Sequence, residues 1–305
     1  MAPQVSPHPE RVGTSRTFDE PLLLSAPLAK SAATLFCHKD SASGQDCSWI
    51  HGPWQYLRAL RLVTTPEHQA DFLCTALQSL ARTAHRRVLI SGAADYSMLA
   101  HVLRTYAKEG VSADVTVVDL CETPLFLCRW YARGFGVRVE TVASDILDYK
   151  AVEPFDLVCT HAFLEQFSPA GRKFLMAKWQ KLLRPGGAVV TVTSLRPSAA
   201  PEEARFAPDQ ARAFRDTAVR RAEESRDVLA VDPEEVAKWV EVYTQRCCTY
   251  PIRSREEILG LFIEGGFAIE YFDSGELGAV AGRQPSGPTA AGSADYAQVI
   301  ASRSS

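Results

Sequence analysis

The residues best suited to chemistry stand at two turns, each directly after an apolar run. The small residues at 92–94, Gly-Ala-Ala, follow the run 87–91 and let the backbone approach a ligand closely. Asp119 ends the second run, which starts at 115, and its carboxylate there can accept hydrogen bonds from both hydroxyls of a ribose. This spacing predicts a nucleotide-binding site. The alternative interpretation is that Asp119 only caps a helix.

Two strands and one helix are needed to position these turns. The runs 87–91 and 115–118 are short and continuous, as buried parallel strands are. Between them, apolar residues recur at helical spacing from Met98 to Tyr106, and Gly110 ends the helix. The whole stretch is therefore predicted to fold as a strand–helix–strand unit.

Further apolar runs alternate with helical patterns along the rest of the chain. This alternation predicts an α/β fold with a Rossmann-like, doubly wound, seven-stranded sheet that is mostly parallel. No helix separates the last two runs, so we expect the last strand to be antiparallel. The later strands are expected at 137–142, 155–161, 188–194, 268–273 and 295–302.

The sequence divides into a tail, a helical segment and a core. Residues 1–17, rich in Pro, Ser and Arg, are expected to be disordered, and 18–84 to form a helical N-terminal segment that covers a substrate. The core is expected over 85–305, interrupted by a charged helical insert at 201–250 that serves as a lid. Most arginines of the insert alternate with acids at helical spacing, which is typical of a solvated helix face.

Composition and charge narrow the class of protein. The 305 residues carry a formal net charge of −3, so we expect no nucleic-acid partner. We find no apolar stretch that would span a membrane or act as a signal peptide, so we expect a cytoplasmic protein with no membrane partner. The 8 cysteines include no C-x-x-C pair, and His and Cys are too scattered in sequence for ligand spacing, so no metal site is predicted.

Six motifs follow one another along the core: VLISGAAD, VTVVDL, SDIL, FDLVCTHAFLEQF, LRPGGAVVTV and EEILGLFIEGGFAIEYF. In this order they resemble the class I S-adenosylmethionine-dependent methyltransferases, from about residue 86 to the C-terminus. Ile90, Ala94 and Tyr96 depart from that family, which often has an acid and two glycines at these positions. The resemblance therefore does not identify the residues that hold the methionine end of the donor.

The resemblance implies S-adenosylmethionine as the cofactor. Asp119 would hold the ribose and Asp145 the adenine amino group, while Gly92 would admit the backbone close to the donor. The residues expected to bind the cofactor are Ser91, Gly92, Ala93, Asp95, Asp119, Leu120, Asp145, Ile146 and Thr160.

Methyl transfer from a sulfonium is an in-line displacement, which chiefly requires that the nucleophile be held about 3 Å from the methyl carbon. An oxygen or nitrogen acceptor also benefits from a base. His161, at the end of the fourth strand, is the best-placed base and has a pKa suited to the task, although it could instead cap a helix or pack in the core. His51 is a second candidate. The residues expected to bind the acceptor are Trp49, Trp54, Tyr56 and Glu165, although the aromatic ones could simply pack between helices and sheet.

These inferences predict a methyltransferase that acts on an oxygen or nitrogen of a small molecule, more specifically a specialised metabolite, and that works as a monomer or homodimer. The main alternative is a non-catalytic S-adenosylmethionine-binding or partner-binding module of the same fold. An aminopropyltransferase also shares the fold, but it would need an acidic fourth-strand motif that we do not find. A dehydrogenase would bind NAD through Asp119, but dehydrogenases usually lack the final antiparallel strand.

Overall fold

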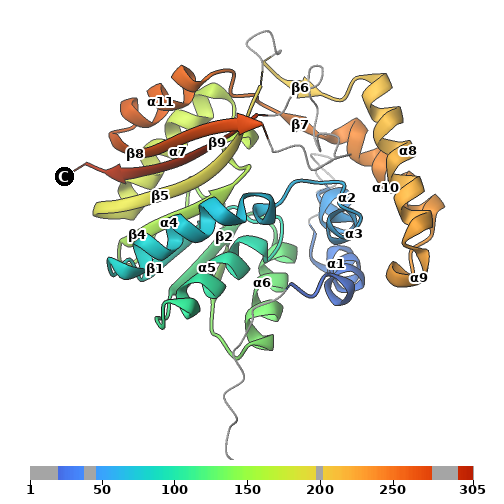
Figure 1. Ribbon diagram of the computed structural model, residues 1–305, viewed down its shortest axis with the longest axis horizontal. Coiled ribbons are helices and arrows are strands. Elements are labelled where there is room, and N and C mark those ends of the chain that lie inside the picture. The colour runs from blue at the N-terminus through green and yellow to red at the C-terminus, as the bar shows by residue number, and fades with distance from the viewer. Residues whose placement is uncertain (1–19, 38–45, 197–201, 277–294, 305) are drawn as a thin grey trace, which may run out of the picture.

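A seven-stranded sheet forms the centre of the protein (Figure 1). The computed structural model describes residues 20–37, 46–196, 202–276 and 295–304, so the predicted tail 1–17 lies outside the described residues. The sheet has the order β3-β2-β1-β4-β5-β9-β8. Its strands are β1 (Arg87–Ser91), β2 (Asp114–Asp119), β3 (Glu140–Ala143), β4 (Phe155–His161), β5 (Leu183–Leu195), β8 (Phe267–Glu276) and β9 (Asp295–Arg303).

The pairing of the strands confirms the predicted fold class. Strands β1 to β5 run parallel to one another, whereas β9 is antiparallel to both β5 and β8. Three predicted strand boundaries were wrong by three residues or more. Strand β8 extends to Glu276, beyond the expected end at 273. Strand β3 starts at Glu140, three residues later than expected from the apolar run. Strand β5 starts at Leu183, five residues earlier than the expected 188, and this early part is irregular, because the register with β4 shifts there and Gly186 has a φ of +72°.

Helices cover both faces of the sheet. On one face lie α4 (Ala70–Arg82), α5 (Ser97–Lys108) and α6 (Glu122–Gly134), and on the other lie α7 (Pro169–Leu182) and α11 (Arg255–Glu264) (Figure 1). Strand β1 alternates between the two cores, because Val88 and Ile90 pack on the first face and Leu89 on the second. Among the described helices, none is both long and apolar enough to cross a membrane.

Local sequence signals start and stop these helices. The Ser254 hydroxyl accepts a hydrogen bond from the backbone N–H of Glu257 and so caps α11 at its start. The helix ends at Glu264, and Gly266 then adopts a φ of +80°, which favours glycine. Gly110, with a φ of +69°, likewise follows the end of α5.

A second helical layer covers the carboxyl ends of the parallel strands (Figure 1). We call it the cap and define it as residues 20–37, 46–69 and 202–250. Its two halves share one apolar core, in which Leu57 and Leu60 pack with Phe214 and Val240. The N-terminal half contains α1 (Leu22–Phe36), α2 (Ser48–His51), α3 (Trp54–Ala59) and η1 (Pro66–Gln69); the insert contains β6 (Ala204–Arg205), α8 (Pro208–Glu224), α9 (Arg226–Leu229), α10 (Pro233–Arg246) and β7 (Cys248–Thr249).

Candidate active site

Asp119 ends β2 and faces the first turn of the fold. One of its carboxylate oxygens accepts a hydrogen bond from the backbone N–H of Ala93 at 2.9 Å, and the other accepts one from that of Cys121 at 2.8 Å. Burial raises the pKa of Asp119 above its ordinary value, and the two N–H donors oppose this shift. Since each carboxylate oxygen has two lone pairs, one acceptor position remains on each for the two hydroxyls of a ribose.

The first turn requires a glycine at position 92. Gly92 has a φ of +75°, and a Cβ atom built there would lie 2.2 Å from the ring of Phe163. Phe163 comes from the segment that follows β4, so its ring closes over the turn. Downstream of the turn, at one of the family's glycine positions, the Tyr96 ring stacks on Tyr131 with 4.6 Å between centroids. The Tyr96 hydroxyl shares a hydrogen bond of 2.9 Å with Ser25 of α1.

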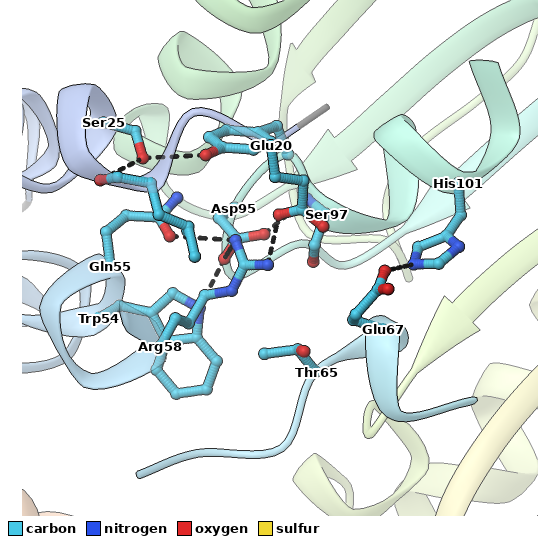
Figure 2. A network of polar contacts seen from close by, with 12 residues as sticks. Glu20, Ser25, Trp54, Gln55, Arg58, Thr65, Glu67, Asp95, Ser97 and His101 are labelled. Carbon is cyan, nitrogen blue, oxygen red and sulfur yellow. Dashed lines mark hydrogen bonds and ion pairs between the residues drawn. The ribbon is translucent and has the colours of Figure 1, made fainter. Parts of the chain in front are cut away.

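A buried polar network joins the first turn to the cap (Figure 2). Asp95 accepts hydrogen bonds from Trp54 Nε1 at 2.8 Å and from the backbone N–H of Ser97 at 2.6 Å. It also pairs with the Arg58 guanidinium at 3.0 Å. Arg58 makes a second ion pair with Glu20, and the side chains of Arg58 and Asp95 are almost fully buried. Cap residues, rather than water, therefore satisfy much of the hydrogen bonding and charge of the Asp95 carboxylate.

Two donors of this network are buried without a hydrogen-bond partner among the described residues: Gln55 Nε2 and Arg58 Nε. The network contains one cation and two carboxylates. Burial raises the pKa of Glu20, one of these carboxyls. Neither Gln55 nor Arg58 was predicted as a site residue. Their spacing of three residues on α3 is visible in the sequence, but only the packing of the cap decides which helix face is buried.

The predicted adenine side contains one exposed, one half-buried and one buried residue, Leu120, Asp145 and Ile146 respectively. Leu120, directly after Asp119, is 68% exposed, which leaves a large apolar side chain uncovered beside the Asp119 carboxylate. Asp145 accepts a hydrogen bond from the backbone N–H of Leu147 at 2.8 Å and so starts the turn after β3. Ile146 is buried in the core.

Ser91 and Thr160 are fully buried at the ends of β1 and β4. The Thr160 hydroxyl donates to the backbone carbonyl of Ser91 at 2.9 Å, and Trp179 Nε1 donates to the Ser91 hydroxyl at 3.1 Å. These bonds hold β1 to β4 and to α7. Both hydroxyls are therefore engaged within the protein core.

His161 ends β4, and its Nε2 is buried without a hydrogen-bond partner in the described part of the chain. Burial lowers the pKa of His161 to about 3, with further lowering by His68, His101 and Arg58 and an opposing effect of Asp95. The expectation of a pKa suited to a general base was therefore wrong, because the sequence does not reveal that Nε2 is buried. The ring is neutral at physiological pH and is a weak proton acceptor, but Nε2 remains available for a hydrogen bond.

His51 has different surroundings from His161. Its Nδ1 lies 3.5 Å from the sulfur of Cys37, within a group of cysteine side chains at the edge of the cap. The structure therefore does not join the two predicted bases into one catalytic pair.

The predicted aromatic residues divide between the first turn and the core of the cap. Trp54 reaches the turn through its bond to Asp95. Trp49 instead packs on Tyr243 with 6.0 Å between ring centroids, and Tyr56 packs on Trp239 at 5.1 Å. Trp49 and Tyr56 therefore fit the alternative interpretation, that they pack between structural elements, better than a role in lining a substrate pocket.

Glu165 follows β4 in η2 (Leu164–Gln166) and is almost fully buried. Its carboxylate accepts hydrogen bonds from the backbone N–H of Ser194 at 3.0 Å and from the Thr193 hydroxyl at 3.3 Å. Its backbone carbonyl accepts one from the N–H of Tyr250 at 2.8 Å. Glu165 thus connects the end of β4 to β5 and to the insert.

Comparisons with known proteins gave one family match and several structural neighbours. Residues 99–187, from α5 into the start of β5, match the family described as a methyltransferase domain. No curated protein matches the sequence. A putative O-methyltransferase structure from Nostoc punctiforme is 17% identical, with a TM-score of 0.48 and coverage of 93% of this chain and 70% of that one. The magnesium protoporphyrin IX methyltransferase of Synechocystis with bound S-adenosylmethionine is 11% identical, with a TM-score of 0.45 and coverage of 82% and 83%.

A protein of pyocyanin biosynthesis is 16% identical with a TM-score of 0.45, and the alignment covers 75% of this chain but 54% of that one. The present chain thus spans about half of that relative. Residues 99–187 thus carry a methyltransferase domain, and they lie within a sheet of strand order β3-β2-β1-β4-β5-β9-β8.

Proposed function

We propose that this enzyme transfers the methyl group of S-adenosylmethionine to an oxygen or nitrogen of a small-molecule acceptor bound beneath the cap. The observation that carries the proposal is the closure of the cap over the strand ends. Trp54 of the cap bonds to Asp95 in the first turn, and Thr64 bonds to Tyr296 at the start of β9. Such a covered site suits a small ligand better than a macromolecule, so we infer a specialised metabolite as the acceptor.

The chain offers matching groups for each part of the donor. Asp119 keeps two acceptor positions for the ribose, and the exposed Leu120 side chain can cover one face of the adenine. The buried donors Gln55 Nε2 and Arg58 Nε are suited to the methionine carboxylate. Arg58 is one cation between two carboxylates, and the resulting negative charge favours binding of the donor, whose net charge is positive. When bound, S-adenosylmethionine supplies a methyl group that is already activated on its sulfonium sulfur.

His161 is suited to orient the acceptor. Its unpartnered Nε2 can accept a hydrogen bond from a hydroxyl or amine, which fixes the direction of the nucleophile's lone pair. With a pKa of about 3, His161 contributes mainly by position rather than as a strong base. Alignment of this kind is the largest requirement of an in-line displacement.

The cofactor site is tested by calorimetric titration with S-adenosylmethionine and S-adenosylhomocysteine. We expect saturable binding that weakens at least about tenfold in Asp119→Asn, because a hydrogen bond to a charged group contributes roughly 1.5–3 kcal/mol. Asp114→Asn is the matched control, since Asp114 lies at the other end of the same strand with a side chain 72% exposed. Absence of binding to the folded wild-type protein would overturn the proposal.

The acceptor is tested next, by measuring S-adenosylhomocysteine formation with a panel of phenols, carboxylic acids and amines. Turnover that falls strongly in His161→Leu and is partly retained in His161→Gln supports the orienting role. Tight donor binding with no turnover across the panel would instead favour the non-catalytic binding module.

A further inference from the structure

Four side chains with metal-binding atoms meet where the cap joins the sheet. Cys37 follows the end of α1, Cys47 and His51 lie at the two ends of α2, and Cys121 stands just before α6. Their sulfur and ring nitrogen atoms all lie within 4.8 Å of one another. Cys37 and Cys121 are buried, and Cys47 and His51 are half-buried. The four residues come from three separate segments, and Cys37 and Cys121 are 84 positions apart.

The spacing of these atoms fits a tetrahedral zinc site. A zinc ion with bonds of about 2.3 Å to sulfur and about 2.0–2.1 Å to nitrogen sets its ligands roughly 3.8 Å apart for two sulfurs and roughly 3.6 Å for sulfur and nitrogen. Here the sulfurs of Cys37 and Cys47 lie 3.7 and 3.6 Å from that of Cys121, and His51 Nδ1 lies 3.5 Å from the sulfur of Cys37. Three measured edges thus match those of an ideal ZnCys3His tetrahedron within about 0.2 Å.

The groups around the sulfurs support metal binding over simple packing. The backbone N–H of Thr123 donates to the sulfur of Cys121 at 3.4 Å, and the Thr123 hydroxyl lies 3.2 Å from the sulfur of Cys37. Donors of this kind orient thiolate ligands in metal sites. A disulfide explains the arrangement less well, because the sulfur separations are far from the bond length of about 2.05 Å and one of the three cysteines would remain unpaired.

We propose that Cys37, Cys47, His51 and Cys121 bind one Zn²⁺ ion that fastens the cap to the sheet. Four protein ligands leave no open position, so the site is structural rather than catalytic. The ion joins α1 and α2 to the start of α6, two residues beyond Asp119. The backbone N–H of Cys121 also bonds to Asp119, so the ion steadies the ribose-binding carboxylate as well. This inference replaces the expectation that the chain has no metal site, and it does not depend on methyl transfer.

The first test measures metal content in the full-length protein purified without chelator. We expect about one zinc ion per chain, measured by mass spectrometry of the metals. The zinc content should be at least tenfold lower in Cys47→Ser. This position is suited to substitution because Cys47 is half-buried and stands at a helix start. Cys74→Ser is the matched control and should keep its zinc, because Cys74 is a half-buried cysteine of α4 outside the group.

The second test needs no variant, so it remains informative even where a substitution impairs folding. Wild-type protein is stripped of metal under reducing conditions and titrated with Co²⁺ alone. One equivalent should give the visible absorption of tetrahedral cobalt with thiolate charge-transfer bands, and one equivalent of Zn²⁺ should abolish it. Zinc loading should also slow proteolytic cleavage within residues 20–63. Substoichiometric zinc in the purified protein, together with no tetrahedral cobalt spectrum from the folded and fully reduced chain, would overturn the proposal.

Discussion

Arg58 is the residue whose replacement tests the structural reasoning most directly. Its guanidinium is 3% exposed and lies between Glu20 and Asp95, with a further hydrogen bond to Gln55 at 3.0 Å. The change Arg58→Met keeps much of the apolar side-chain volume and removes the charge. It leaves two carboxylates without their cation, one of them 1% exposed and the other 12% exposed.

The size of the effect follows from this geometry. Removing one partner of a buried ion pair typically costs about 3–5 kcal/mol, because the remaining charge stays buried and unpaired. Two features moderate the loss. Asp95 keeps its bonds from Trp54 and Ser97, and the pKa of Glu20 is already raised by burial, which makes protonation easier. We therefore expect the free energy of unfolding to fall by about 3 kcal/mol, near the lower end of that range.

The assay is equilibrium denaturation followed by circular dichroism and by tryptophan fluorescence, which reports on Trp54 beside Asp95. The control is Arg82→Met, which breaks the exposed ion pair of Arg82 with Glu109 and should leave stability nearly unchanged. Adding Glu20→Gln and Asp95→Asn to Arg58→Met should restore at least half of the lost stability, because the buried charges are then gone.

The predicted role of the buried charges is refuted if Arg58→Met costs less than about 1 kcal/mol, the level of an exposed pair. It is also refuted if neutralising both carboxylates deepens the loss instead of reversing it. In that case, the network would act through packing and hydrogen bonds rather than through the balance of buried charges.

Two further predictions concern the same edge of the sheet. The pKa of His161 is about 3 in the folded protein and about 6.5 in the unfolded chain, so below pH 6.5 the unfolded state binds the additional proton and stability is lost. From pH 7 to pH 5, the free energy of unfolding should therefore fall by about 2 kcal/mol more in the wild type than in His161→Gln, as measured by denaturant unfolding at both pH values. Equal losses in the two proteins would contradict the burial of the His161 ring. Gly92→Ala should lower the free energy of unfolding by at least about 1–2 kcal/mol from its left-handed backbone alone, with an additional cost from the contact of 2.2 Å with Phe163. Since Phe163→Ala removes that ring, a double-mutant cycle in denaturant should give a smaller cost for Gly92→Ala in the Phe163→Ala background, and strict additivity would count against the close approach.

Much of the fold could be predicted from the sequence because the signals are local. Strand β4 was predicted with its observed bounds, and β1 and β2 were predicted to within one residue, because a buried strand is an unbroken apolar run. The antiparallel last strand followed from the absence of a helix between two late runs. Strand β3 was less accurate, since its side chains are only partly buried at the sheet edge and its apolar pattern is weaker.

The features of the candidate active site also differ in whether local sequence or tertiary packing sets them. The sequence alone was enough to predict that Asp119 ends β2 and that Gly92 follows β1, because each position depends on a few neighbouring residues. The tertiary structure alone decided that Arg58 neutralises Asp95, that Cys37 meets Cys121, and how far burial lowers the pKa of His161. These features depend on which helix faces pack together and on how completely water is excluded between them. Contacts across 84 positions are set by the packing of whole elements, and no local pattern of residues encodes them.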